Sequence, residues 1–152
     1  MHSEWKKDRF LVSTDPTKLD VDAVHAFLSH AYWCEGIPWE IVARALQNSL
    51  CFGLYDDGKQ IGLARVVTDR ATFAYLCDVY VLESHRGSGL GKWLISCVMA
   101  HPQLQGLRRF NLVTRDAHEL YTPFGFKTLA APERHMEMVK PDIYKAAGIG
   151  GN

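Results

Sequence analysis

Three glycines at alternate positions, Gly87, Gly89 and Gly91, are the residues whose spacing most directly predicts chemistry in this sequence. They follow an apolar run and precede a segment that is predicted to be a helix. Glycine accepts positive φ angles and close backbone approach, so successive N–H groups can point at one anion beside the positive end of a helix dipole. The pattern therefore predicts a site for phosphate groups. An ordinary glycine-rich turn is the alternative interpretation.

Two common phosphate-binding loops do not fit this turn. A Walker A loop has Ser or Thr after its Gly-Lys pair, whereas Trp93 follows Lys92 here. A dinucleotide-binding loop has the spacing G-x-G-x-x-G and opens a parallel strand–helix–strand unit, whereas the strands predicted before this turn are antiparallel. Both assignments are therefore disfavoured.

The elements around the turn predict a three-layer α+β fold, in which helices flank a mixed, mostly antiparallel central sheet. Asp20 is a predicted N-cap, and the pair Asp57-Gly58 is a hairpin signal between two strands. Strands joined by such tight turns must be antiparallel neighbours. The predicted order is strand 8–13, helices 20–31 and 39–48, strands 50–55, 60–68 and 71–82, helix 91–101, strand 109–114, helix 117–124, and strands 126–129 and 135–140.

The strand before the glycine turn is apolar on both of its faces. Strict alternation places Tyr75 and Val79 on one face, and Leu76 and Tyr80 on the other. A strand of this kind is predicted to be central and covered by other elements on both sides.

The composition predicts a single globular domain over residues 1–152. The 17 basic and 17 acidic residues give a net charge of +0, which argues against bulk capture of nucleic acid. No apolar stretch reaches the roughly 18 residues of a membrane span, and the N-terminus lacks the apolar core of a signal peptide. The cysteines lack disulfide or metal-ligand patterns and are interpreted as reduced thiols of a cytoplasmic protein: Cys34, Cys51, Cys77 and Cys97.

Residues 81–91, VLESHRGSGLG, resemble the acetyl-coenzyme A loop of the GCN5-related N-acetyltransferases, the GNAT family. That loop reads [R/Q]-x-x-G-x-[G/A], and the arginine and last two glycines of this chain stand at its diagnostic positions. The proline that often precedes the loop is absent here. A second family pattern, A-x-x-L-Y-x-x-x-G-F, matches residues 117–126, AHELYTPFGF. The resemblance covers roughly residues 50–140, and two patterns in the right order are more specific than either alone.

The resemblance implies that acetyl-coenzyme A (acetyl-CoA) is the cosubstrate and that no metal is involved. Main-chain N–H groups of the loop would hold its pyrophosphate. Its pantetheine arm would pair with the backbone of Val79, Tyr80 and Val81, and the N–H near Val79 would polarise the thioester carbonyl. Relatives often carry Asn where this chain has Thr114, whose hydroxyl could make a similar contact. The loop residues expected to bind the cofactor are Arg86, Gly87, Ser88, Gly89, Leu90, Gly91 and Lys92.

Tyr121 and Asp78 are the predicted catalytic residues. By resemblance, Tyr121 protonates the departing thiolate as a general acid, and its alternative role is packing in the core or against the cofactor. Asp78 has apolar neighbours in the sequence and is therefore preferred to Glu83 as the general base. Asp78 could equally bind the substrate ammonium or accept a structural hydrogen bond.

The acceptor pocket is expected to lie between the first two helices, their connecting loop and the middle strands. The predicted acceptor-binding residues are Trp33, Arg65 and Tyr75. Aromatic rings would wall an apolar or cationic group, and Arg65 would pair with an acceptor carboxylate. The aromatic residues could equally be core residues, and Arg65 could pair with Asp78.

The resemblance predicts transfer of an acetyl group from acetyl-CoA to a primary amine of a small molecule or peptide, by direct attack in a ternary complex. A non-catalytic coenzyme A-binding module and a transferase of longer acyl chains are the alternatives. Tyr121 favours an enzyme, because a module that only binds needs no acid beside the sulfur. Neither nucleic acid nor membrane is an expected partner. Many relatives are homodimers, but the sequence identifies no interface and no particular acceptor.

Overall fold

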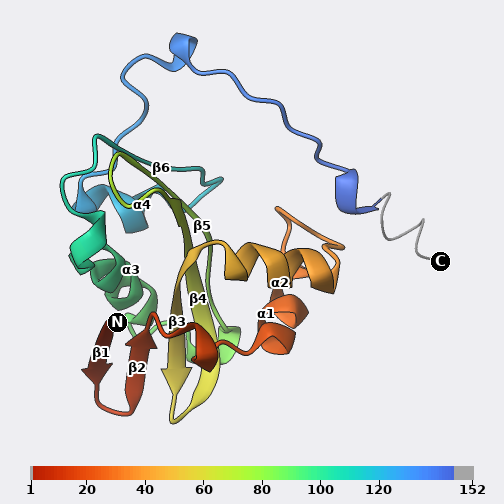
Figure 1. Cartoon of the computed structure of the whole chain (residues 1–152), viewed down its shortest axis with the longest axis vertical. Coiled ribbons are helices and arrows are strands. Elements are labelled where there is room, and N and C mark those ends of the chain that lie inside the picture. The colour runs from red at the N-terminus through yellow and green to blue at the C-terminus, as the bar shows by residue number, and fades with distance from the viewer. Residues whose placement is uncertain (1, 146–152) are drawn as a thin grey trace.

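The protein is described here by a computed structural model that covers residues 2–145 (Figure 1). The described chain forms a three-layer α+β fold with one open sheet, whose strand order is β1-β2-β3-β4-β5-β6. The strands are β1 (Glu4–Lys7), β2 (Phe10–Ser13), β3 (Leu50–Asp56), β4 (Lys59–Thr68), β5 (Phe73–Val81) and β6 (Arg109–Leu112). The α-helices are α1 (Val21–Leu28), α2 (Trp39–Gln47), α3 (Leu90–Ala100) and α4 (His118–Tyr121).

The sheet is mixed, as predicted. Strands β1 to β5 pair antiparallel in sequence order, whereas β6 pairs parallel with β5. The N-terminal strand predicted at 8–13 is instead the second half of a hairpin, β1 and β2, which turns at Asp8 with a positive φ of 56°. None of the described helices is long and apolar enough to cross a membrane.

Two hydrophobic cores lie on opposite faces of the sheet (Figure 1). Helices α3 and α4 cover one face, where Phe52 and Leu94 are fully buried. Helices α1 and α2 cover the other, where Val24 and Leu63 are fully buried. Asp20 caps α1 as predicted, because its side chain accepts a hydrogen bond from the N–H of Ala23.

A β-bulge at Asp78 changes which residues of β5 face each core. Leu63 pairs with Tyr80 and Arg65 pairs with Cys77, so β5 has one more residue than β4 in this interval. Asp78 has a φ of 52°, in the left-handed region. The extra residue shifts the alternation by one, so the prediction that Leu76 and Tyr80 share a face is wrong: Leu76 packs with α3 and Tyr80 with α1 and α2.

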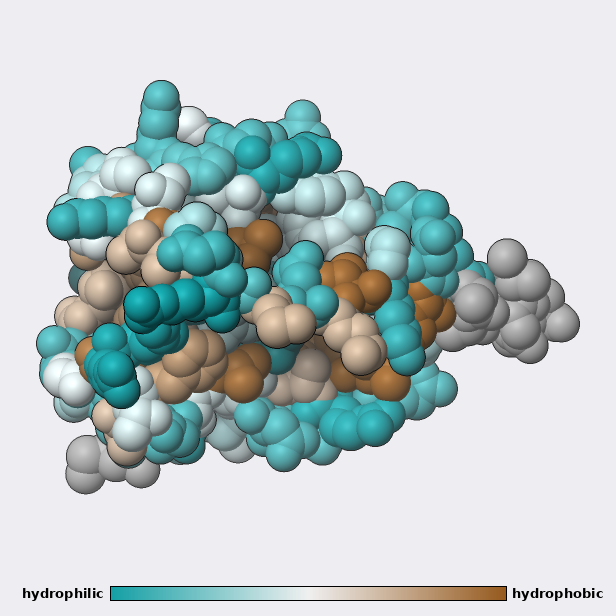
Figure 2. Space-filling view, turned by 90° about the horizontal axis from the view of Figure 1, so that it is seen from above, coloured by the Kyte–Doolittle hydropathy of each residue, from teal (hydrophilic) through white to brown (hydrophobic). Residues whose placement is uncertain are grey.

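The two C-terminal strands predicted at 126–129 and 135–140 are not strands in the structure. Their residues favour an extended backbone, but a strand also requires a hydrogen-bonding partner, and neither segment has one within residues 2–145. Residues 135–140 instead run from the β6 side of the molecule toward α1 and α2 (Figure 1). Seen from above, hydrophobic residues gather along the middle of this face, between polar margins (Figure 2).

Candidate active site

The site begins where β5 and β6 separate. The two strands pair in register from Phe73 with Arg109 to Leu76 with Leu112, and no further pair follows. Strand β5 nevertheless continues to Val81, paired there only with β4. Its edge at Val79–Val81, where the sequence predicts the pantetheine contact, is therefore free of any described strand. An extended ligand that carries amide groups could add to such an edge.

A cavity of about 480 Å³ fills the opening between β5, β6 and the segment after α1. Six of its lining residues were predicted as site residues: Trp33, Tyr75, Asp78, Val79, Thr114 and Tyr121. The other lining residues are Tyr32, Leu76, Cys77, Leu112, Val113, Arg115, Asp116 and Ala117. The Arg115 guanidinium lies 3.8 Å from the centre of the Tyr32 ring, a cation–π contact that nothing in the sequence signals.

The glycine turn has the backbone geometry of an anion site. Gly87 and Gly89 have φ angles of 87° and 83°, a region that other residues rarely adopt. Gly89 is the N-cap of α3, and no side chain caps this helix end. The N–H groups from Gly87 to Lys92 donate to no other described residue. The N–H of Arg86 donates to the Glu83 carbonyl, so the predicted set of free donors begins one residue later, at Gly87.

Side chains fix the turn to the sheet from two directions. His85 Nε2 lies 2.8 Å from Asp56 Oδ2, at the end of β3, and Asp56 also pairs with Arg9 at 2.9 Å. Arg86 Nε donates to the Val81 carbonyl at 2.9 Å. The turn is therefore held in place without any ligand, and Arg86 acts through this bond to the backbone. Lys92 is exposed beside it.

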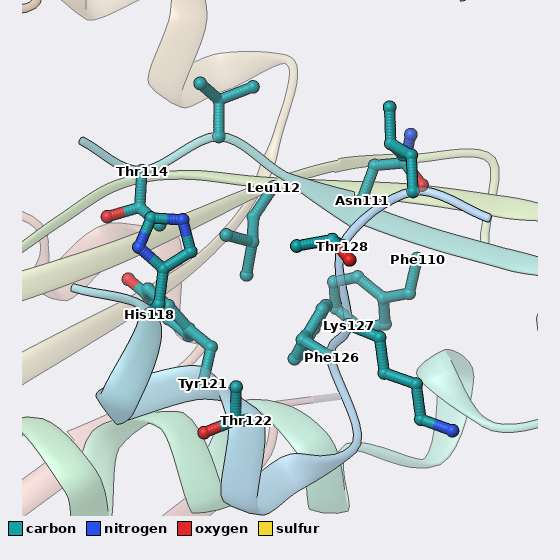
Figure 3. Close-up of a pocket in the computed structure, with 12 residues that line it drawn as sticks. Phe110, Asn111, Leu112, Thr114, His118, Tyr121, Thr122, Phe126, Lys127 and Thr128 are labelled. Atoms are coloured by element: carbon teal, nitrogen blue, oxygen red, sulfur yellow. The ribbon is translucent and has the colours of Figure 1, made fainter. Parts of the chain in front are cut away.

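Tyr121 lies at the junction of two cavities, the one described above and a second one behind β6, and is only 8% exposed. Thr114 Oγ1 accepts a hydrogen bond from the Ala117 N–H at 2.9 Å and so orders the turn that leads into α4. Figure 3 shows Tyr121 and Leu112 projecting into the space behind β6. Burial, followed by the nearby Tyr32, raises the pKa of Tyr121 to about 12, so its phenol is protonated at neutral pH.

Asp78 connects the cavity wall to the interior. Its Oδ1 accepts a hydrogen bond from Trp33 Nε1 at 2.8 Å, and its Oδ2 pairs with Arg65 Nε at 2.8 Å. Arg65 also donates to Ser49 Oγ and does not line the cavity. Arg65 therefore takes the alternative role foreseen for it, as a partner of Asp78. Both Asp78 oxygens already accept a hydrogen bond, which leaves only their remaining lone pairs for a substrate proton.

Cys77 also lines the cavity, and a cysteine thiol can act as a nucleophile. No motif of the sequence indicates a role for this residue. Burial raises its pKa to about 12, with Arg65 opposing the shift. The group is therefore a neutral thiol near pH 7, and the reactive thiolate is scarce.

The comparisons with known proteins agree with this fold and show the family. The sequence profile of the acetyltransferase (GNAT) domain matches residues 47–128. A Gibberella zeae protein with the provisional name acetyltransferase FG08082 is 38% identical over 140 residues, covering 77% of this chain and 78% of that protein. The chain belongs to the GNAT acetyltransferase family.

Two solved structures have the same fold. A GNAT-family protein from Xanthomonas campestris pv. campestris superposes with a TM-score of 0.87 at 51% identity, covering 89% of this chain and 96% of that one. A predicted acetyltransferase from Clostridium acetobutylicum, crystallised with acetyl-CoA, superposes with a TM-score of 0.61 at 14% identity, covering 91% and 96%. The second likeness supports the fold alone.

Proposed function

We propose that this protein transfers an acetyl group from acetyl-CoA to a primary amine of a small molecule or peptide, by direct attack within a ternary complex. The observation that carries the proposal is the separation of β5 from β6, which leaves the β5 edge open between the glycine turn and Tyr121. Family membership supplies the reaction class, and acetyl-CoA supplies an activated acyl group when it is bound.

The residues present fit acetyl-CoA along this line. The free N–H groups of the turn, with Lys92, would bind the pyrophosphate at the N-terminus of α3. A Cβ added at Gly91 would meet only Val81 Cγ2, at 3.9 Å, so there is room for a ligand beside the backbone. The edge at Val79–Val81 would then pair with the pantetheine amides. At the far end, Tyr121 carries the proton that a departing thiolate requires.

The acceptor amine would enter the cavity at the part of its wall that aromatic side chains form. Tyr32, Trp33 and Tyr75 line that part of the cavity and suit an apolar or cationic group. Asp78 would receive the amine proton directly or through a water molecule, using the lone pairs that Trp33 and Arg65 leave free. Direct attack agrees with the protonated state of Cys77, because a covalent acyl-cysteine route would need the thiolate.

Release of the coenzyme A thiol tests the proposal. Acetyl-CoA is incubated with amino acids, polyamines, aminoglycosides and peptides, and free thiol is followed over time. We expect release with at least one class of amine, and Tyr121→Phe should lower kcat by about 10²- to 10⁴-fold while the Kd for acetyl-CoA stays unchanged. Tyr55→Phe is the matched control, because the Tyr55 hydroxyl is buried, has no hydrogen-bond partner among residues 2–145 and lies outside the cavity.

The alternatives give different results in the same assay. Binding of acetyl-CoA without thiol release from any acceptor would indicate a coenzyme A-binding module. When a longer acyl-CoA replaces acetyl-CoA in this assay, thiol release from the longer donor alone would indicate a different acyl specificity. Equal turnover by the wild type and Tyr121→Phe would exclude the general-acid role of Tyr121.

A further inference from the structure

A third cavity, of about 280 Å³, lies where β2 ends and β3 continues. Strand β2 ends at Ser13, opposite Gly53, whereas β3 begins at Leu50, so the first part of β3 has no partner in β2. Thr14 after β2, together with Leu50 and Cys51 of β3, lines the cavity at this place. The lining shares no residue with the two cavities described above.

Basic and neutral side chains line this cavity. The basic ones are His2, Arg70 and His101, and among residues 2–145 no aspartate or glutamate joins them. Asp15 lies 3.7 Å from His2 but outside the lining. Arg70 is exposed and forms no ion pair within the described chain. A cavity whose charged groups are all basic attracts anions.

His101 supplies a buried hydrogen-bond donor beside this cavity. The residue is only 5% exposed, and its Nδ1 accepts a hydrogen bond from the Gln103 N–H at 3.1 Å. Burial, followed by the positive charge of Arg70, lowers the pKa of His101, so its ring is neutral near pH 7. A neutral imidazole that accepts at Nδ1 carries its proton on Nε2. No residue within 2–145 accepts that proton, so the donor is available to a ligand.

An ordered turn between β4 and β5 holds Arg70. Its φ is 62°, in the left-handed region that few residues other than glycine adopt. The Arg70 N–H donates to Thr68 Oγ1 at 2.8 Å, and the Asp69 carboxylate accepts from the N–H groups of Ala71 and Thr72. These bonds keep the turn in one conformation despite the unfavourable φ. Retention of such a residue is typical of positions that contact a ligand.

We propose that the third cavity binds a small anion, a molecule that carries a phosphate or carboxylate group. The anionic group would lie between the Arg70 guanidinium and the His101 ring, with His2 as a further cation. The side-chain amides of Gln47 and Gln103, which also line the cavity, would donate to the remaining oxygens of the ligand.

This site lies at the opposite end of α3 from the glycine turn. Gly89 is the N-cap of the helix and His101 is its C-cap, and the 11 residues between them span about 16 Å. Carbonyl groups at the C-terminal end of a helix repel an anion. Here Gln105 Nε2 donates to the carbonyls of Met99 and His101, at 2.8 and 3.0 Å, which offsets that repulsion.

Ser49 connects the third cavity to the candidate active site. It lines the cavity, and its Oγ accepts a hydrogen bond from the Arg65 guanidinium at 3.0 Å. Arg65 in turn pairs with Asp78. An anion bound in the third cavity would therefore lie next to the contacts that hold the proposed general base in place.

An NMR titration of the isotopically labelled full chain tests this proposal. Sodium phosphate and sodium malonate are added separately, at constant ionic strength. We expect the backbone N–H signals of Arg70 and Gln103 to shift until the site is saturated. The indole N–H of Trp5 should shift with them, because its ring lies 6.5 Å from that of His101. The indole N–H of Trp39, outside the cavity, is the internal control and should not shift.

Saturation by only one probe would identify the group, phosphate or carboxylate, that the site accepts. Arg70→Asn removes the cation at little cost to the fold, because Asn accepts a positive φ. This variant should raise the Kd for the probe about tenfold, as for the loss of one charge-assisted hydrogen bond. Lys59→Gln is the matched control, since it removes one positive charge from an exposed residue outside the cavity, and it should leave the Kd unchanged.

Three results would each overturn the proposal. They are the absence of a saturable shift with both probes, shifts confined to residues 87–92 of the glycine turn, and equal Kd values for Arg70→Asn and Lys59→Gln. None of these readouts depends on acetyl transfer.

Discussion

A hydrogen bond of 2.8 Å joins Trp33 Nε1 to Asp78 Oδ1, between residues 45 positions apart in the chain. It connects the segment after α1 to the bulge of β5. The other Asp78 oxygen is held by Arg65, so the carboxylate is fixed from within the sheet and fixes Trp33 in turn. One wall of the cavity at the separation of β5 and β6 depends on this pair.

Trp33→Phe should weaken acceptor binding. The ring becomes smaller and loses its bond to Asp78, so we expect KM for the acceptor to rise about tenfold, as for the loss of about 1.4 kcal/mol of binding free energy. The Kd for acetyl-CoA should not change. Trp39→Phe is the control, because Trp39 Nε1 makes an equivalent 2.8 Å bond to Asp22 outside the cavity. Equal KM values for the two variants would contradict a role for Trp33 in the acceptor site.

Asp56→Asn should weaken acetyl-CoA binding, although Asp56 is not one of the residues proposed to contact the cofactor. The substitution replaces the carboxylate that pairs with His85 and Arg9 by a neutral amide, so the connection between the glycine turn and the end of β3 becomes weaker. We expect an increase of several-fold in the Kd for acetyl-CoA, measured by calorimetry. Asp57→Asn, in the exposed β3–β4 turn, should leave the Kd unchanged, since Asn also accepts its φ of 49°. A normal Kd for Asp56→Asn would show that the turn holds its shape alone.

Gly89→Ala should reduce both stability and cofactor binding. A Cβ at a φ of 83° costs about 1–2 kcal/mol of folding free energy, although no described atom would clash with it. Gly106→Ala, at a φ of 72° and also in open space, should have a similar cost in urea unfolding but no effect on acetyl-CoA binding. The difference in Kd between the two variants isolates the contribution of the turn. If both variants bind acetyl-CoA equally well, Gly89 does not shape the site.

The folded protein should lose stability as the pH rises above about 9. Burial raises the pKa of Cys51, Cys77 and Tyr121 to about 12, from ordinary values of 9.0 for the thiols and 10.0 for the phenol. The unfolded chain therefore releases these protons first, and the stability linked to them is full below pH 9 and lost as the pH approaches 12. Urea unfolding across this range should show the decline, and Cys51→Ala should make it shallower. An unchanged slope in that variant would contradict the assignment.

Features that depend on neighbouring residues could be predicted from the amino-acid sequence. The glycine turn and α3 were predicted correctly, because three glycines, a preceding apolar run and a following helical pattern are all local signals. Tyr121 was recognised within a family pattern, and the structure places it in the wall of the cavity. The antiparallel order of β3, β4 and β5 followed from short connections, which leave the chain no other pairing.

Features that depend on a residue distant in the sequence became visible only in the folded chain. The bulge at Asp78 comes from a mismatch between β4 and β5, and it moves Tyr80 to the face opposite Leu76, which alternation within β5 alone cannot reveal. Asp78 meets Trp33 and Arg65 because three separate segments converge on the bulge. Residues 135–140 have the pattern of a strand, but pattern fixes only an extended backbone. A strand also needs an edge to pair with, and within residues 2–145 this segment pairs with none.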